Sequence, residues 1–172
     1  SEETVASVIA RGREKLLLER NGRITPFVDR TFYTSLNGMF ITSFFKAFRV
    51  LGDDDLRDFA LTSLERVLKE RFVNGALLHT DGVPAMLDDH IYLIEAFIAA
   101  YEATGDDAWL GRATGFMDRC LELFGDDEGG FFDTPEAVLG ARLKHIEDIP
   151  HPSANATAAL LLIKLSHLTG RE

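Results

Sequence analysis

The feature that most constrains the fold is a repeated pattern of long apolar segments, each of which ends at a glycine. Gly52, Gly105 and Gly170 close three such segments and are 53 and 65 residues apart. A residue type that commonly caps a helix N-terminus stands seventeen positions before each glycine: Ser35, Asp88 and Ser153. The pattern therefore predicts three helices that begin and end in the same phase.

A second set of polar residues follows the same period. Two positions after the predicted caps stand Asn37, His90 and Asn155, and Gly-Asp-Asp follows two of the helices, at 52–54 and 105–107. The repeat predicts helical hairpins in which inner and outer helices alternate. This is the pattern of an all-α fold, with three helical hairpins forming an arc of an (α/α) toroid.

Hydrophobic periodicity predicts six helices. The expected ranges are 2–20, 35–50, 53–72, 88–103, one that begins at 106–107 and ends before Gly125, and 153–168. All five prolines fall outside them. The segment 77–79 is expected to be a short extended piece, and 137–149 a loop. The fourth and sixth helices are apolar on nearly every side and are expected to be inner helices, covered on more than one side.

Composition excludes several classes of protein. The 172 residues carry 18 Lys and Arg against 28 Asp and Glu, a net charge of −10, which argues against nucleic acid or an anionic membrane as the partner. No apolar run is long enough to cross a bilayer. Cys120 is the only cysteine, which favours a cytoplasmic setting, and it is expected to be an inert thiol in the core.

The strongest candidates for chemistry are Asp88, Asp89 and His90, at the start of the fourth helix. The two carboxylates and the imidazole could act as acid and base on a sugar or polyol. The alternative is structural: Asp88 caps the helix, Asp89 interacts with its dipole, and His90 is a hydrogen-bonded core residue. Because a cap engages Asp88, Asp89 is the better catalytic candidate.

The ends of the other two inner helices supply candidate ligand-binding residues. If the inner helices begin in the same phase, Ser35, Asn37, Ser153 and Asn155 lie together at one end of the arc. The helix dipoles at that end favour an anion or a polyhydroxy ligand. Phe131 and Phe132 could stack on a sugar, although the alternative is that they fill the space between hairpins. The preceding loops add six more polar candidates: His79, Asp81, Lys144, His145, Asp148 and His151.

The sequence predicts no metal and no cofactor. It has no H-E-x-x-H motif, no pair of cysteines and no glycine-rich phosphate loop. The acidic run 126–128 lacks the spacing of a calcium-binding loop.

Five motifs that occur in order resemble the helical region of the thioredoxin-domain-containing, spermatogenesis-associated protein family. They lie at 34–38, 87–95, 101–106, 129–134 and 152–155, and the resemblance covers about 13–169. The chain departs from the family pattern at Leu36, where tryptophan is usual, and at His90, where an aromatic residue is usual. The family has no agreed activity, so the resemblance assigns no catalytic residue.

The resemblance implies a wider setting for the chain. The helical region of this family is similar to the toroids of N-acylglucosamine 2-epimerases and several glycosidases, which implies a carbohydrate-binding or carbohydrate-processing domain. The alternative is a non-catalytic scaffold beside a thioredoxin-like domain. Because the chain does not begin with Met, residues 1–172 are expected to be one helical domain excised from a larger toroid. Its expected partners are a sugar or polyol, the thioredoxin-like domain, the remaining hairpins and a second copy of itself.

Overall fold

The computed structural model describes residues 2–138 and 140–171, and contacts divide the chain into two units. The first unit, 1–31, has α1 (Glu2–Asn21) as its one regular element among the described residues. None of the large apolar side chains described on this helix is buried. The second unit, 32–172, carries every other helix and strand, where the sequence predicts one domain over the whole chain.

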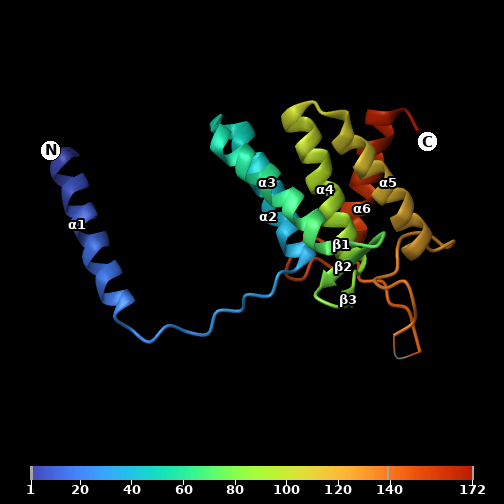
Figure 1. Cartoon of the computed structure of the whole chain (residues 1–172), viewed down its shortest axis with the longest axis horizontal. Coiled ribbons are helices and arrows are strands. Elements are labelled where there is room, and N and C mark those ends of the chain that lie inside the picture. The colour runs from blue at the N-terminus through green and yellow to red at the C-terminus, as the bar shows by residue number, and fades with distance from the viewer. Residues whose placement is uncertain (1, 139, 172) are drawn as a thin grey trace. The chain divides into compact units, whose positions relative to one another are not determined.

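Helices form an inner row and an outer row in the second unit (Figure 1). The inner helices are α2 (Thr34–Leu51), α4 (Leu87–Thr104) and α6 (Ala154–Thr169), with α4 in contact with both of the others. The outer helices are α3 (Asp54–Arg71), which packs on α2, and α5 (Asp107–Phe124), which packs on α4. The all-α class and the arc of helical hairpins are thus confirmed, with helix bounds close to those predicted.

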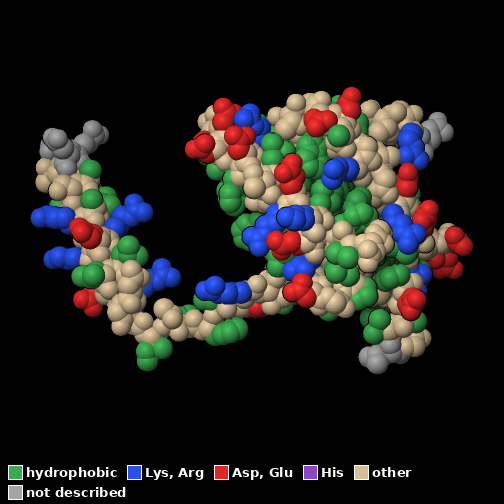
Figure 2. All heavy atoms as spheres, in the orientation of Figure 1, with side chains coloured by type: hydrophobic (Ala, Val, Ile, Leu, Met, Phe, Trp, Pro, Cys, Tyr) green, Lys and Arg blue, Asp and Glu red, His purple; other side chains and the backbone are tan. Residues whose placement is uncertain are grey.

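Glycine ends each inner helix in the same way. Gly52, Gly105 and Gly170 have φ of 68°, 70° and 69°, a left-handed conformation that favours glycine, and each donates its N–H to the carbonyl four residues earlier. Asp53 and Asp106 then cap α3 and α5 through their side chains. Acidic side chains gather at this end of the unit (Figure 2). The repeat in the sequence is therefore a repeated turn.

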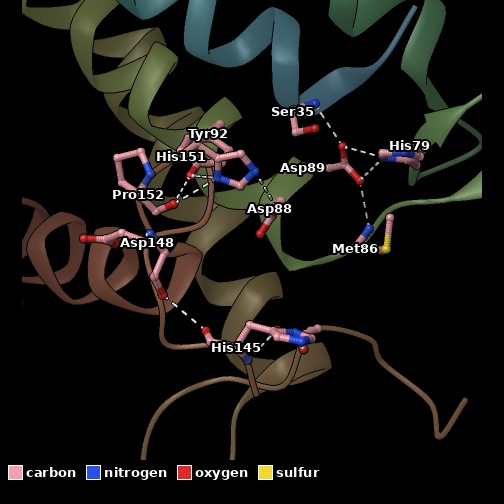
Figure 3. A network of polar contacts seen from close by, with 12 residues as sticks. Ser35, His79, Met86, Asp88, Asp89, Tyr92, His145, Asp148, His151 and Pro152 are labelled. Atoms are coloured by element: carbon pink, nitrogen blue, oxygen red, sulfur yellow. Dashed lines mark hydrogen bonds and ion pairs between the residues drawn. The ribbon is translucent and has the colours of Figure 1, made fainter. Parts of the chain in front are cut away.

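A small antiparallel sheet lies between α3 and α4, where the sequence predicts only a short extended piece. Its strands are β1 (Phe72–Val73), β2 (Ala76–Thr80) and β3 (Val83–Pro84), in the order β1-β2-β3. Asn74 and Gly75 form the first turn, both at positive φ, as a tight hairpin turn requires. The sheet carries His79 towards the start of α4 (Figure 3).

The core of the unit centres on α4, which is buried on nearly all sides. The sixth helix is covered on fewer sides than α4, because α6 exposes 69% of Leu160 and 59% of Ile163. Within the part of the chain that the structure describes, α6 contacts only α4 and α5, so the side that carries Leu160 and Ile163 has no helix packed on it. Self-association through such a surface stays a prediction. None of the helices among the described residues is long and apolar enough to span a membrane.

We expect Gly38→Ala to be strongly destabilising. An added Cβ would lie 2.8 Å from the backbone carbonyl of Tyr92, so α2 and α4 would have to separate. Gly111→Ala is the matched control, because an added Cβ there meets nothing within 4 Å and alanine favours a helix by about 1 kcal/mol. Urea unfolding should show the two substitutions moving stability in opposite directions; equal effects would contradict the close approach.

We also expect Cys120 to be unreactive in the folded protein. Its side chain is fully buried, and burial raises the pKa of the thiol to about 12, so almost no thiolate exists at neutral pH. A thiol reagent should modify the native protein only at the rate of unfolding, and the urea-unfolded protein at once. Rapid modification without unfolding would show that the core opens.

Candidate active site

The carboxyl group of Asp89 holds the ends of two inner helices and the small sheet together (Figure 3). It is fully buried and accepts the N–H of Ser35 at 2.9 Å, at the start of α2. It also accepts the N–H of Met86 at 2.9 Å, and the Nδ1 of His79 lies 2.9 Å from its Oδ2. Because a carboxyl oxygen of this kind accepts, Nδ1 of His79 carries the proton in this contact.

The sequence assignment of the helix cap is wrong by two residues. The helix begins at Leu87 with Met86 as its N-cap, so Asp89 is the third helical residue and reaches back to the cap N–H. An acidic residue at this position is half of a capping box. Asp89, and not Asp88, therefore has the structural role. Ser35 is likewise inside α2, after the N-cap Tyr33, whereas Ser153 does cap α6.

Asp88 lies on a cavity at the same end of the helices. Its side chain is 40% exposed, and its Oδ2 lies 3.8 Å from Nε2 of His151. The cavity has a volume of about 720 Å³, which suits a small ligand. Polar side chains from α2, β2, α4 and the loop 125–153 line it, together with apolar ones: the polar set is Ser35, His79, Asp88, Asp133, Thr134, His145, Glu147, His151 and Ser153.

His151 is held by two oxygen atoms on its far side. The hydroxyl of Tyr92, on α4, donates to the carbonyl of Pro152, which can only accept. Nδ1 of His151 lies 2.9 Å from that hydroxyl oxygen and 3.1 Å from the same carbonyl. Nδ1 therefore carries a proton, and Nε2 is left free to exchange one with Asp88.

The surroundings of Asp88 favour its protonated form. Burial raises the pKa of this carboxyl, and the charge of Asp89 raises it further, whereas His151 lowers it. Burial also raises the pKa of Tyr92 to about 12, so this phenol stays a hydrogen-bond donor at neutral pH. A carboxyl with a raised pKa in a cavity is a candidate proton donor.

A second histidine reaches the cavity from the loop 125–153. Nδ1 of His145 lies 2.5 Å from Oδ2 of Asp133, whose Oδ1 accepts the N–H of His145. The imidazole is exposed, so its Nε2 is open to a ligand. The sequence placed this residue among the loop candidates but gave it no role.

Two predicted site residues, His90 and Asn37, lie away from Asp88 in the structure. His90, two positions later on α4, is 5% exposed and packs against Phe124 of α5, with its Nδ1 on the carbonyl of Met86. It does not line the cavity of Asp88, so the structure does not bring its imidazole together with that carboxyl group. Asn37 donates to the carbonyl of Tyr33 within its own helix.

Three other expected ligand-binding residues organise the loop 125–153. Asn155 binds both backbone groups of Phe131, at 2.7 and 2.9 Å. Phe131 is 5% exposed in the core, and Phe132 stacks under Arg142 and Lys144. Neither ring lines the cavity of Asp88.

Three of the polar loop candidates also have structural partners. Asp81 pairs with Arg71, Lys144 pairs with Asp126, and Asp148 accepts the N–H of Ser153 at 2.8 Å. Within the described ranges, no three His, Cys, Asp or Glu side chains group closely enough to hold a metal ion.

The fold and this site define the class: an arc of an (α/α) toroid (Figure 1) with a cavity, lined by histidine and carboxyl groups among apolar side chains, at the N-terminal ends of its inner helices. Among solved structures, cellobiose 2-epimerase of Bacillus thermoamylovorans has a TM-score of 0.67 at 16% identity, over 84% of this chain and 41% of its own. An α-1,6-mannanase of Salegentibacter has a TM-score of 0.62 at 16% identity, over 91% and 48%. At such identities the likeness shows the fold alone.

Sequence comparison supplies the particular relatives. Spermatogenesis-associated protein 20 of Homo sapiens is 30% identical over 189 residues, which cover 99% of this chain and 24% of the relative. The rat protein of the same name is 29% identical. These homologues confirm the resemblance to the spermatogenesis-associated family. The chain spans about a quarter of their length, and no family model matches it.

Substitutions of Asp88 and Asp89 should differ in their effect on the free energy of unfolding. We expect Asp89→Ala to lower the free energy of unfolding by about 3 kcal/mol, because two buried N–H groups lose their acceptor. Asp88→Ala, which removes no hydrogen bond of the helix end, should change it by less than about 1 kcal/mol. Urea titration followed by circular dichroism measures both, and a larger loss for Asp88→Ala would contradict the assignment.

Proposed function

We propose that the cavity binds a carbohydrate and that Asp88 is the general acid of a carbohydrate-processing reaction. The observation that carries the proposal is the pairing of Asp88 with His151 at 3.8 Å in a cavity that other histidine and carboxyl groups also line, with the pKa of Asp88 raised by burial. This is the convergence of polar groups and a perturbed carboxyl that distinguishes an enzyme from a scaffold.

The neighbouring structures support the chemical class. Two are a cellobiose 2-epimerase and a sugar epimerase from a ruminal bacterium. The mannanase structure is an inactive variant with two consecutive aspartates replaced by asparagine, in complex with α-1,6-mannotriose. Asp88 and Asp89 are also consecutive, and in this chain one is buried and hydrogen-bonded while the other meets the cavity.

The proposed roles follow from the contacts. Asp88 donates its proton to a sugar oxygen and recovers one through Nε2 of His151, whose ring Tyr92 holds in place. Asp89 fixes the start of α4 through its hydrogen bonds, and the fixed helix start in turn positions Asp88. His145, held by Asp133, is the second imidazole within reach of a ligand, and suits a reaction that removes a proton from carbon.

The test is a titration of the chain with α-1,6-mannotriose and with cellobiose, followed by NMR chemical shifts and by product analysis. Asp88→Asn should keep sugar binding and lower turnover by about 100-fold or more. Asp127→Asn, an exposed substitution in the loop 125–153, is the control and should leave both unchanged.

The pH profile gives a second measure. If Asp88 must be protonated, turnover falls as pH rises through its pKa, and this limb lies above the range of an ordinary aspartate because burial raises that pKa. Substituting His151 should move the limb to higher pH, since His151 lowers the pKa of Asp88. A profile without this limb would remove Asp88 from the role of acid.

The alternative function is a non-catalytic scaffold that accompanies a thioredoxin-like domain. Its specific support is the exposed apolar side of α6, with Leu160 and Ile163 open to a partner. Failure of both sugars to shift any resonance of the cavity, together with concentration-dependent association in light scattering, would favour the scaffold.

A further inference from the structure

A second cavity lies on the opposite side of α4 from Asp88. It has a volume of about 570 Å³ and is bounded by the sheet and by α5. His90 lines it, and because successive helical residues turn by about 100°, His90 and Asp88 face nearly opposite directions. The candidate active site uses none of its lining residues.

The walls of this cavity are apolar and partly aromatic. Phe72 of β1 and Phe116 of α5 both line it, with ring centroids 5.3 Å apart. Gly75 and Gly115 contribute no side chains, which leaves space between the hairpin and the helix. A flat apolar ring fits such walls better than a flexible polar chain.

His90 places one hydrogen-bond acceptor at the buried end. Its ring is 5% exposed, and Nδ1 lies 3.1 Å from the carbonyl of Met86, which can only accept, so Nδ1 carries the proton. Burial lowers the pKa of His90, which keeps the ring neutral. Nε2 therefore carries a lone pair that has no hydrogen-bond partner among the described residues. This atom is not completely enclosed by the protein, so a ligand in the cavity can reach it.

Two arginines supply the charge of the cavity. Arg112 and Arg119 line it from α5, and no acidic residue does, although the chain has a net charge of −10. Arg119 pairs with Glu122 at 2.9 Å with both side chains largely exposed, whereas Arg112 has no ion pair within the part of the chain that the structure describes. The rim is therefore complementary to an anion.

We propose that this cavity binds an aromatic carboxylate whose ring carries an N–H or O–H donor. The ring lies against Phe72 and Phe116, the donor binds Nε2 of His90, and the carboxylate binds the arginines. The site is separate from the proposed carbohydrate site and does not depend on it.

Indole-3-acetate is a suitable probe, measured by isothermal titration calorimetry on the whole chain. It should bind at one site, and indole-3-ethanol, which lacks the carboxylate, should bind about tenfold more weakly or worse. 1-Methylindole-3-acetate, which lacks the N–H, should lose a similar factor. Equal affinity for the three compounds, or no binding of indole-3-acetate, would overturn the proposal.

A pair of glycine substitutions on α5 locates the site. Gly115→Leu places a side chain in the cavity, where an added Cβ meets nothing within 4 Å, and should abolish binding. Gly111→Leu makes the same change one turn away, outside the lining residues, and should leave binding intact. If indole-3-acetate binds both variants equally, it occupies another site, on a surface that a protein partner could use. The proposal is then wrong.

Discussion

The arrangement of the second unit depends on one buried carboxyl group. Asp89 accepts hydrogen bonds from the start of α2, 54 residues earlier, from the start of its own helix and from the imidazole of His79 on β2. A buried group of this kind is stabilising only when every partner is present, since an unpaired donor in the interior is costly. The hydrogen bonds of Asp89 therefore fix the positions of α2 and α4 along their axes and hold the β-hairpin against the start of α4.

This constraint explains why neighbouring aspartates have different roles. Asp89 is enclosed because it lies at the third position of α4, over the helix start, and Asp88, one residue earlier, is turned towards the loop 125–153. The rigid residue holds the reactive one in place. Tyr92, one turn further along α4, does the same for His151. The proposed acid and its partner are thus both positioned by one helix.

Periodicity was enough to predict the helices, their order and the glycine turns, because each inner helix repeats an apolar segment that ends at a glycine. It was not enough to assign Asp88 and Asp89, since the N-cap is Met86, two residues before the predicted cap, and the structural role then falls on Asp89. The acidic residue three after Met86 is a capping-box signal that could have corrected this. The histidines at 79, 145 and 151 meet only through tertiary contacts, so the sequence could place them in loops but not around one cavity. The sequence of α6 shows that the helix is apolar on nearly every side, but which of its sides is exposed depends on the elements that surround it.

The two ends of the helical arc differ in how they are connected. At the end opposite the cavity, α2 passes to α3 and α4 to α5 through turns that a single left-handed glycine closes. At the cavity end, the segments 72–86 and 125–153 are long and form the walls themselves. Insertions and exchanges at the exposed positions of these segments, which leave His79, Met86 and Phe131 in place, are expected to preserve the helix-to-helix packing, since loop length costs little free energy once the ends are fixed. The chain is accordingly suited to loop grafting: new ligand preferences can be introduced at one end while the glycine-closed turns preserve the scaffold at the other.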